Sequence, residues 1–302
     1  MDRGDSVDGG DPVIDLQFSK LHATGNDFLV LLALDPLETE LDAVVVSALC
    51  DRHRGVGADG VITIGPGRDG ADCTMTLVNA DGGRAEMSGN GMRCLAWVAA
   101  RAGLARGEEL IVDTAGGRRH VTVRRDASGA VVAADVDMGA ITFEPERIPV
   151  TAPSAFDLEA VVDGTTYCGD AAGIGNPHFV LPVADPGEVP VTVHGPQLEH
   201  DPRFPRRVNV EFIAVTGPDR LAMRVWERGA GETQSCGTGA CASAAVAHRR
   251  GLVSDHVRVD VLGGTLAVTL GETVRLGGPV VHVFDVVMPR DRLLESLARP
   301  AG

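Results

Sequence analysis

The chain of 302 residues is long enough for two domains with separate cores, and its 44% hydrophobic content is typical of a soluble globular protein. Its formal net charge of -15 argues against nucleic acid or an anionic membrane as a partner, because both attract clustered positive charge. The apolar run Phe28–Leu34 is far too short to span a bilayer, and the acidic start Met1–Asp5 does not fit a signal peptide. We therefore expect a cytoplasmic protein.

Cysteine and lysine usage limits the cofactors that this chain could bind. No Cys-x-x-Cys spacing occurs, so neither a zinc site nor a disulfide framework is predicted, and reduced thiols are expected. Lys20 is the only lysine, so a pyridoxal-phosphate enzyme would have to form its Schiff base there. We expect no cofactor and no metal. The six cysteines are Cys50, Cys73, Cys94, Cys168, Cys236 and Cys241.

The chain opens with a segment that has little apolar surface and continues into strands. Residues 1–14 are rich in Asp and Gly, which predicts a flexible tail. From Leu16 a strand pattern runs to a turn at Thr24–Asp27 and resumes at Phe28. A second Gly-Asn turn at Gly175–His178, 150 residues later, indicates an internal repeat.

The next segments predict a helix at Ala43–Asp51, a loop at Gly55–Gly60 and a strand at Val61–Ile64. Gly65–Gly70 matches the Gly-x-Gly-x-x-Gly fingerprint of dinucleotide-binding proteins. That fingerprint requires a helix after it, whereas Cys73–Leu77 alternates as a strand. The match is therefore interpreted as a hairpin loop.

Two stretches, Met75–Leu104 and Met223–Leu252, align without a gap at an offset of 148. Each runs from a strand pattern through a Gly-rich loop into a helix of small apolar residues, predicted at Gly89–Ala102 and Gly237–His248. The position before each helix holds Ser88 in the first copy and Cys236 in the second. Gly103 and Gly251 are expected to end the two helices.

The repeat predicts an α+β fold with two pseudo-symmetric α/β halves. Each half is expected to be a mostly antiparallel sheet wrapped around one central buried helix, followed by two strands hinged on Gly-Gly. We expect the first half to comprise residues 15–138 plus 279–298 and the second half residues 139–278. The two helix starts are expected to face each other across a shared cleft.

Gly-rich loops that open a helix leave backbone N–H groups free to bind an anion, so two such loops could hold one small carboxylate ligand between them. A phosphate loop is excluded because it would need a lysine after its last glycine. A thiol at a helix N-terminus has a depressed pKa, which makes Cys236 a candidate base or nucleophile. The alternative for Cys236 is a packing role, which we assign to Cys94 and Cys241.

Other polar residues could line the same pocket. His178 follows a turn, so we expect it to be less buried than a strand histidine such as His120 or His282. Glu227 and Arg228 end a repeated strand, and the alternative for them is a surface ion pair. Four asparagines at symmetric places near the helices could be turn residues or pocket residues: Asn26, Asn79, Asn176 and Asn209.

Five ordered motifs resemble diaminopimelate epimerase. They are Lys20–Phe28, Asn79–Gly82 leading to Glu86–Gly91, Gly175–His178, Asn209–Phe212, and Glu227–Gly229 leading to Ser235–Gly239. The resemblance extends from Leu16 to Val287 and implies a cofactor-independent homodimeric isomerase that converts LL-diaminopimelate to the meso form, in lysine and peptidoglycan precursor synthesis. It implies that two thiols act as base and acid on opposite faces of the α-carbon.

The resemblance also assigns site residues. It implies that the distal end of the substrate is held by Asn26, Asn79, Asn176, Asn209 and Arg228. It implies that the reacting carboxylate is bound by the backbones of Gly89, Asn90, Gly237 and Thr238. The catalytic residues are expected to be Cys236, Ser88, His178 and Glu227, with His178 and Glu227 aiding proton abstraction by Cys236. Glu227 is also expected to bind the substrate.

One departure from the family falls on the chemistry, because Ser88 stands at the position of the first catalytic cysteine. A hydroxyl is far less acidic than a thiol, so impaired turnover is expected. Ser88 could be a deliberate change that traps substrate, a natural paralogue with altered chemistry, or a mark of lost activity. The alternatives to an epimerase are an amino-acid dehydratase or racemase of the related superfamily, and a catalytically dead amino-acid binding protein. Gly60 is a lesser departure, where the family often has glutamine.

Overall fold

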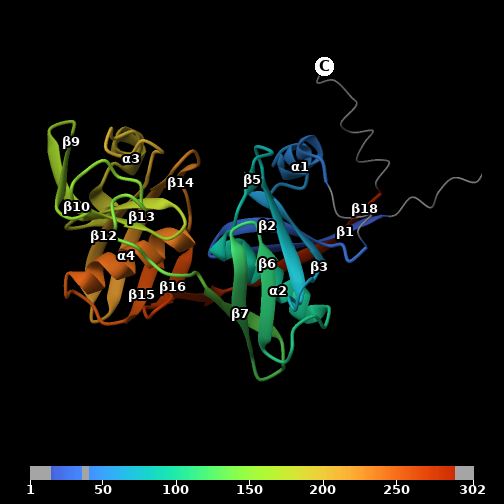
Figure 1. Ribbon diagram of the computed structural model, residues 1–302. Coiled ribbons are helices and arrows are strands. Elements are labelled where there is room, and N and C mark those ends of the chain that lie inside the picture. Colours follow the sequence, from blue (N-terminus) through green and yellow to red (C-terminus); the bar gives the residue numbers. More distant parts are fainter. Residues whose placement is uncertain (1–14, 36–40, 290–302) are drawn as a thin grey trace, which may run out of the picture.

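The computed structural model describes residues 15–35 and 41–289, which form a mixed α/β fold of mostly strands and few helices (Figure 1). The flexible tail predicted for residues 1–14 lies outside the described residues, as do residues 290–298 of the predicted first half. In Figure 1 the elements gather into two groups, with α4 in one and α2 in the other.

The group around α2 holds the first elements of the chain. They are β1 (Leu16–Ala23), β2 (Asn26–Leu32), α1 (Ala43–Cys50), β3 (Gly60–Pro66), β4 (Cys73–Asn79), β5 (Arg84–Ala85), α2 (Gly89–Arg101), β6 (Glu109–Thr114), β7 (Gly117–Arg125) and β8 (Val131–Asp137). The β3–β4 pairing is antiparallel and spans the loop between Pro66 and Cys73. The interpretation of Gly65–Gly70 as a hairpin loop is therefore confirmed.

The group around α4 holds the following elements. They are β9 (Leu158–Val162), β10 (Thr165–Gly173), β11 (Pro177–Pro182), the 3₁₀ helix η2 (Pro186–Glu188), α3 (Val191–Glu199), β12 (Asn209–Gly217), β13 (Arg220–Glu227), β14 (Gly231–Glu232), α4 (Gly237–Arg249), β15 (His256–Val261) and β16 (Gly264–Thr269). Two last strands follow, β17 (Arg275–Pro279) and β18 (Val281–Met288).

Strand pairing follows one order in both groups. A parallel pair, β2–β3 or β11–β12, is followed by an antiparallel pair, β3–β4 or β12–β13. A second parallel pair, β4–β6 or β13–β15, leads to the hairpins β6–β7 and β15–β16. The long helix lies between the same strands each time, after β5 or β14. Sequence positions 148 apart therefore occupy equivalent places.

Both long helices are buried in apolar surroundings. Eleven of the 13 residues of α2 and ten of the 13 residues of α4 are buried. The alanine-rich sequence of α4 lets surrounding strands approach closely, and one continuous core contains side chains from both helices. Gly103 and Gly251 follow the helices with φ of 76° and 71°, the left-handed conformation that ends a helix and that glycine adopts without strain.

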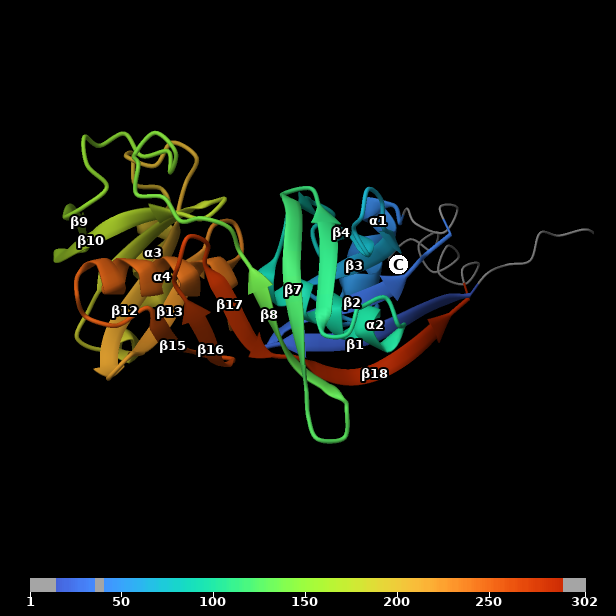
Figure 2. The ribbon, with the colours of Figure 1, turned by 60° about the horizontal axis from the view of Figure 1, so that its bottom comes forward.

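The last two strands connect the two groups. Strand β17 pairs with β16 on one side and with β8 on the other, and β18 then runs antiparallel to β1 (Figure 2). Strand β18 thus returns the chain to its first strand. Because β17 pairs with strands of both groups, the domain division at residues 138 and 278 stays a prediction.

Helix α3 has no counterpart among the elements expected from the sequence. Its segment VTVHGPQLE contains Gly195 and Pro196, which weaken a helical pattern. Gly195 is required by packing, since a Cβ there would come within 2.5 Å of the Trp226 ring. Contact with Trp226 is a tertiary effect that local sequence does not reveal.

Candidate functional site

Ser88 and Cys236 are the N-cap residues of α2 and α4. Both have extended backbones, which place each side chain over the first turn of its helix. The Ser88 Oγ accepts a hydrogen bond from the Gly91 N–H at 3.1 Å, and the Cys236 Sγ accepts one from the Gly239 N–H at 3.3 Å. The two reactive side chains predicted from the repeat therefore occupy equivalent positions.

The two helix starts approach each other through their glycines. A Cβ built on Gly237 would lie 3.8 Å from the Gly89 Cα, and a Cβ on either glycine would lie 2.7 Å from the Leu276 Cδ2. A side chain at either position would have to displace the Leu276 side chain. The positive ends of two helix dipoles, with their free N–H groups, therefore point into one region, which favours a bound carboxylate.

Cys236 is buried among acidic groups. The thiol lies 3.5 Å from the Thr238 Oγ1, and half-buried Glu227, which accepts a hydrogen bond from Thr233, lies close beside it. Burial and the negative charges of Glu227 and Glu211 raise the pKa of the Cys236 thiol well above its usual value. The expectation of a depressed pKa was wrong, because burial and two carboxylates outweigh the hydrogen bonds from Thr238 and Gly239, which lower the pKa.

The carboxyl of Glu227 is perturbed in the same direction. Burial raises its pKa, and the charge of Glu211 adds to the effect, while hydrogen bonds from Thr233 and Cys236 oppose it. A raised pKa makes an ionised carboxylate a better proton acceptor than usual, so an ionised Glu227 can take a proton from the neighbouring thiol. The pair can therefore supply a proton or, after losing it, accept one.

His178 lies in the same region, at the start of β11 rather than in a turn. Its exposed fraction is 0%, whereas His120 is exposed and His282 half-buried, so the expected order of burial was wrong. The physical reason is that the turn ends at Asn176 and β11 is already a core strand at His178. The ring bonds Glu211 and Asn176, with Nδ1 2.6 Å from Glu211 Oε1 and Nε2 2.9 Å from Asn176 Oδ1.

Glu211 has no role among the residues predicted from the sequence, although it lies inside one of the resembling motifs. It is fully buried on β12, and its Oε2 has no hydrogen-bond partner. A charged residue in the centre of an apolar strand (Val210-Glu211-Phe212) was the signal that could have identified it.

The α2 side of the site is a hydrogen-bonded network that joins both groups of elements. The Asn90 Nδ2 donates to the Ser235 carbonyl at 2.9 Å and to the Asn26 Oδ1 at 3.2 Å. The Thr24 hydroxyl donates to the Ser235 Oγ at 2.7 Å, and fully buried Arg93 donates to Thr24 and Asn90. The network ties the loop before Cys236 to the start of α2.

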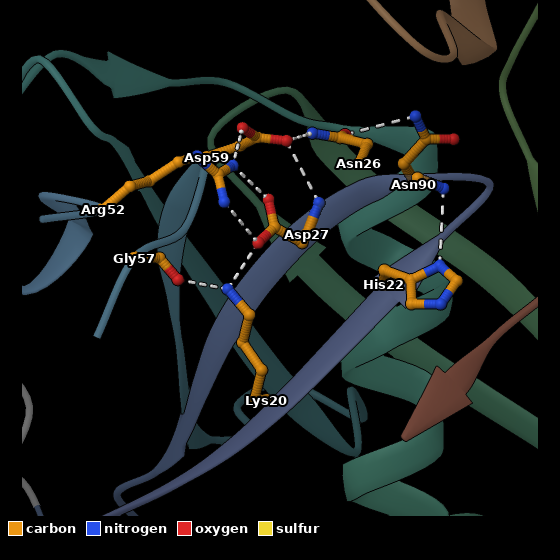
Figure 3. A network of polar contacts seen from close by, with 9 residues as sticks. Lys20, His22, Asn26, Asp27, Arg52, Gly57, Asp59 and Asn90 are labelled. Atoms are coloured by element: carbon orange, nitrogen blue, oxygen red, sulfur yellow. Dashed lines mark hydrogen bonds and ion pairs between the residues drawn. The ribbon is translucent and has the colours of Figure 1, made fainter. Parts of the chain in front are cut away.

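Figure 3 shows how charged residues fix Asn26. The Asn26 amide lies between Asn90 and the Asp59 carboxylate, to which its Nδ2 donates at 2.6 Å. Arg52 bridges Asp59 and Asp27, and the buried ammonium of Lys20 bonds Asp27 and the Gly57 carbonyl. With its N–H group bound to Asp59, Asn26 has little freedom to reorient.

The remaining predicted binding residues differ in their surroundings. Buried Asn209 accepts a hydrogen bond from the Arg228 N–H at 2.9 Å and donates to the Pro177 carbonyl at 3.1 Å. The Arg228 guanidinium is exposed and donates to the Arg206 carbonyl. The alternative of a Glu227–Arg228 ion pair is wrong, because Glu227 bonds Thr233 instead. Asn79 is exposed at the end of β4.

Within residues 15–35 and 41–289, no group of three or more His, Cys, Asp or Glu side chains is arranged to hold a metal ion. In the same residues no helix combines the length and apolar character needed to cross a membrane.

A cavity of about 290 Å³ opens between α1 and the β3–β4 hairpin, and none of the predicted site residues lines it.

A family model described as diaminopimelate epimerase matches residues 18–144 and 171–281. The chain is 40% identical over 281 residues to the diaminopimelate epimerase of Heliobacterium modesticaldum, covering 91% of this chain and 100% of that protein. It is 41% identical over 282 residues to that of Moorella thermoacetica, with the same coverage.

Among solved structures, a hydroxyproline epimerase from Agrobacterium vitis matches with a TM-score of 0.67 and 18% identity, over 93% of this chain and 94% of that chain. A PhzF-family phenazine biosynthesis protein from Bacillus anthracis matches with a TM-score of 0.65 and 16% identity, over 91% and 99%. These two likenesses show a shared fold.

Proposed function

This chain belongs to the diaminopimelate epimerase family, and from that premise we propose that it interconverts LL- and meso-diaminopimelate without a cofactor, in lysine biosynthesis. The observation that carries the proposal is that the N-termini of α2 and α4 lie close together. Each is capped by a side chain that can exchange a proton, Ser88 or Cys236. The pseudo-symmetry of the two halves matches a reaction that removes a proton from one face of a carbon and returns it on the other.

The reacting carboxylate is proposed to bind the backbones of Gly89, Asn90, Gly237 and Thr238. Removing the α-hydrogen puts negative charge on the carbon and its carboxylate, and N–H groups fixed at two helix starts stabilise that charge without reorganisation. The close approach of the Gly89 and Gly237 backbones supports this assignment.

Cys236 is proposed as the acid and base on one face, with Glu227 as its proton partner. The raised pKa values of both groups mean that the free protein holds Cys236 as a thiol, which suits proton donation. To act as base, the thiol must first transfer its proton to Glu227 or to another acceptor.

Ser88 is proposed to serve the opposite face. Its hydroxyl can donate a proton, but in the reverse direction it would have to act as an alkoxide base, which neutral pH does not provide. We therefore infer impaired turnover. His178 is proposed to support the reaction from within the site.

The distal end of the substrate is proposed to bind Asn26, Asn79, Asn176, Asn209 and Arg228. Fixed amides and a guanidinium are suitable donors for a second carboxylate. The hydrogen bonds that hold Asn26 to Asp59 and Asn209 to Pro177 preorganise these side chains and support the assignment.

A homodimer is proposed on the family resemblance, and the surface of β18 supports it. Four large apolar residues of this strand are exposed, and among the described strands only β1 pairs with it. A second copy would cover this surface. The four residues are Val281, Val283, Phe284 and Val287.

The proposal is tested by incubating the protein with each diaminopimelate stereoisomer in heavy water and following deuterium and stereochemistry at the α-carbon. Slow deuterium entry with inversion supports the epimerase. Tight binding with no exchange would indicate a binding protein instead, and loss of water from a hydroxylated amino acid would indicate a dehydratase.

A further inference from the structure

The contacts around His178 determine how many protons the Glu211–His178 pair holds. Each ring nitrogen faces an oxygen: Nδ1 faces Glu211 Oε1 at 2.6 Å and Nε2 faces Asn176 Oδ1 at 2.9 Å. With the Asn176 oxygen toward the ring, Nε2 carries the proton of this contact, because an amide oxygen can only accept. The short contact at Nδ1 requires another proton, located on the ring or on the carboxyl. The pair therefore holds two protons and has no net charge.

The burial of Glu211 and His178 independently indicates that the pair holds two protons. Both side chains have an exposed fraction of 0%, and the Glu211 Oε2 has no hydrogen-bond partner. With only one proton the pair would carry a net negative charge, and part of it would rest on that unpartnered oxygen. Glu227 lies nearby and would repel it. With two protons the pair is neutral, so there is no free-energy cost of burying a net charge.

The proton on Nε2 and the orientation of the Asn176 amide depend on each other. While Nε2 carries a proton, the amide keeps its oxygen toward the ring and its Nδ2 toward the Thr238 Oγ1, 3.4 Å away, at the start of α4. If Nε2 lost its proton, the amide would turn by 180° and present its oxygen instead. At the substrate position proposed above, an Nδ2 donor would suit a carboxylate, whereas an oxygen acceptor would suit an ammonium group.

We propose that Glu211, acting through His178, is a positioning residue that fixes the Asn176 amide as a hydrogen-bond donor and so selects a ligand with a distal carboxylate. This inference rests on the proposed function, because it assigns Asn176 to the substrate. Glu211 itself is fully buried behind the first turn of α4, with its Oε1 2.7 Å from where a Cβ on Gly239 would lie.

The proton count can be measured on the unmodified full-length protein. Long-range proton–nitrogen correlation spectra of the ¹⁵N-labelled chain report which ring nitrogens of each histidine carry protons. We expect a protonated Nε2 on His178. A His178 protonated only at Nδ1 would overturn the proposal, and this measurement stands whether or not the protein binds diaminopimelate.

The preference for a ligand with a distal carboxylate is tested by calorimetric titration with meso-diaminopimelate and with L-lysine, which lacks that carboxylate. In Glu211→Leu the ring loses its anchor, and we expect diaminopimelate affinity to fall at least about 10-fold while lysine affinity changes much less. Glu211→Gln should restore selectivity, because its amide can donate to Nδ1 and leave the proton on Nε2. Equal losses for both ligands, or Glu211→Gln as weak as Glu211→Leu, would overturn the proposal.

Tyr167→Phe is the matched control. It removes the 2.6 Å hydrogen bond from another buried histidine of the same half, His194, whose polar contacts are with Tyr167 and Asp163 and not with the site residues. We expect both affinities to stay at the parent level in this variant. If the parent binds neither ligand, the proposed function fails, whereas the spectra still decide the proton count.

Discussion

Gly239 separates two buried polar groups, and its replacement by alanine should destabilise the protein. The new Cβ would lie 2.7 Å from the Glu211 Oε1 and 3.2 Å from the Cys236 Sγ. Glu211 cannot move freely, because it is fully buried and bound to His178. Overpacking of this kind costs about 1–3 kcal/mol, and the better helix propensity of alanine returns roughly 0.5–1 kcal/mol. We expect a net loss of about 1–2 kcal/mol.

Gly91 supplies the control, since it is the equivalent position of the repeat. Its new Cβ would meet the Ile62 Cδ1 at 3.0 Å and the Met75 Cε at 3.2 Å, side-chain ends that can shift slightly. Gly91→Ala should therefore change stability by less than about 1 kcal/mol. Calorimetry should show a lower Tm for Gly239→Ala, by roughly 2–4 °C per kcal/mol. Equal Tm values for the two variants would refute the reasoning.

Three further predictions concern charge and access. Despite burial, hydrogen bonds from basic partners lower the pKa of Asp27 to about 2, so their stabilisation is lost as the pH falls from 3.8 to about 2. Asp27→Asn should therefore lose about 2 kcal/mol of unfolding free energy at neutral pH and nothing at the acid end, which denaturant titrations would check. Arg228→Ala should weaken diaminopimelate binding at least about 10-fold by calorimetry, and unchanged affinity would contradict its assignment. Iodoacetamide at neutral pH should modify exposed Cys168 long before buried Cys236, whose pKa is raised; peptide mass spectrometry showing equal rates would contradict this.

Local sequence was sufficient to predict the structure of the repeated segments. The Gly-rich loops, the small residues of both long helices and the glycines that end them all carry a strong periodic signal. These features predicted the helices to within one residue at each end, and they identified Ser88 and Cys236 as equivalent positions.

Local sequence was insufficient to predict properties that depend on residues distant in the chain, which folding brings together. The raised pKa of Cys236 comes from burial and from Glu227 and Glu211, which lie on strands β13 and β12. The burial of His178 depends on β12, which pairs with β11. No spacing within the motifs predicts these contacts, so the sequence suggested a depressed pKa and an accessible histidine.

The central claim, that two proton-exchanging groups at equivalent helix starts perform the epimerisation, is tested most directly by the turnover of Ser88→Cys beside that of the parent. General acid–base groups contribute about 10²–10⁴-fold, so the cysteine variant should epimerise LL-diaminopimelate at least roughly 100-fold faster. Adding Cys236→Ser to that variant should abolish the gain. A parent protein that turns over as fast as Ser88→Cys would contradict the claim.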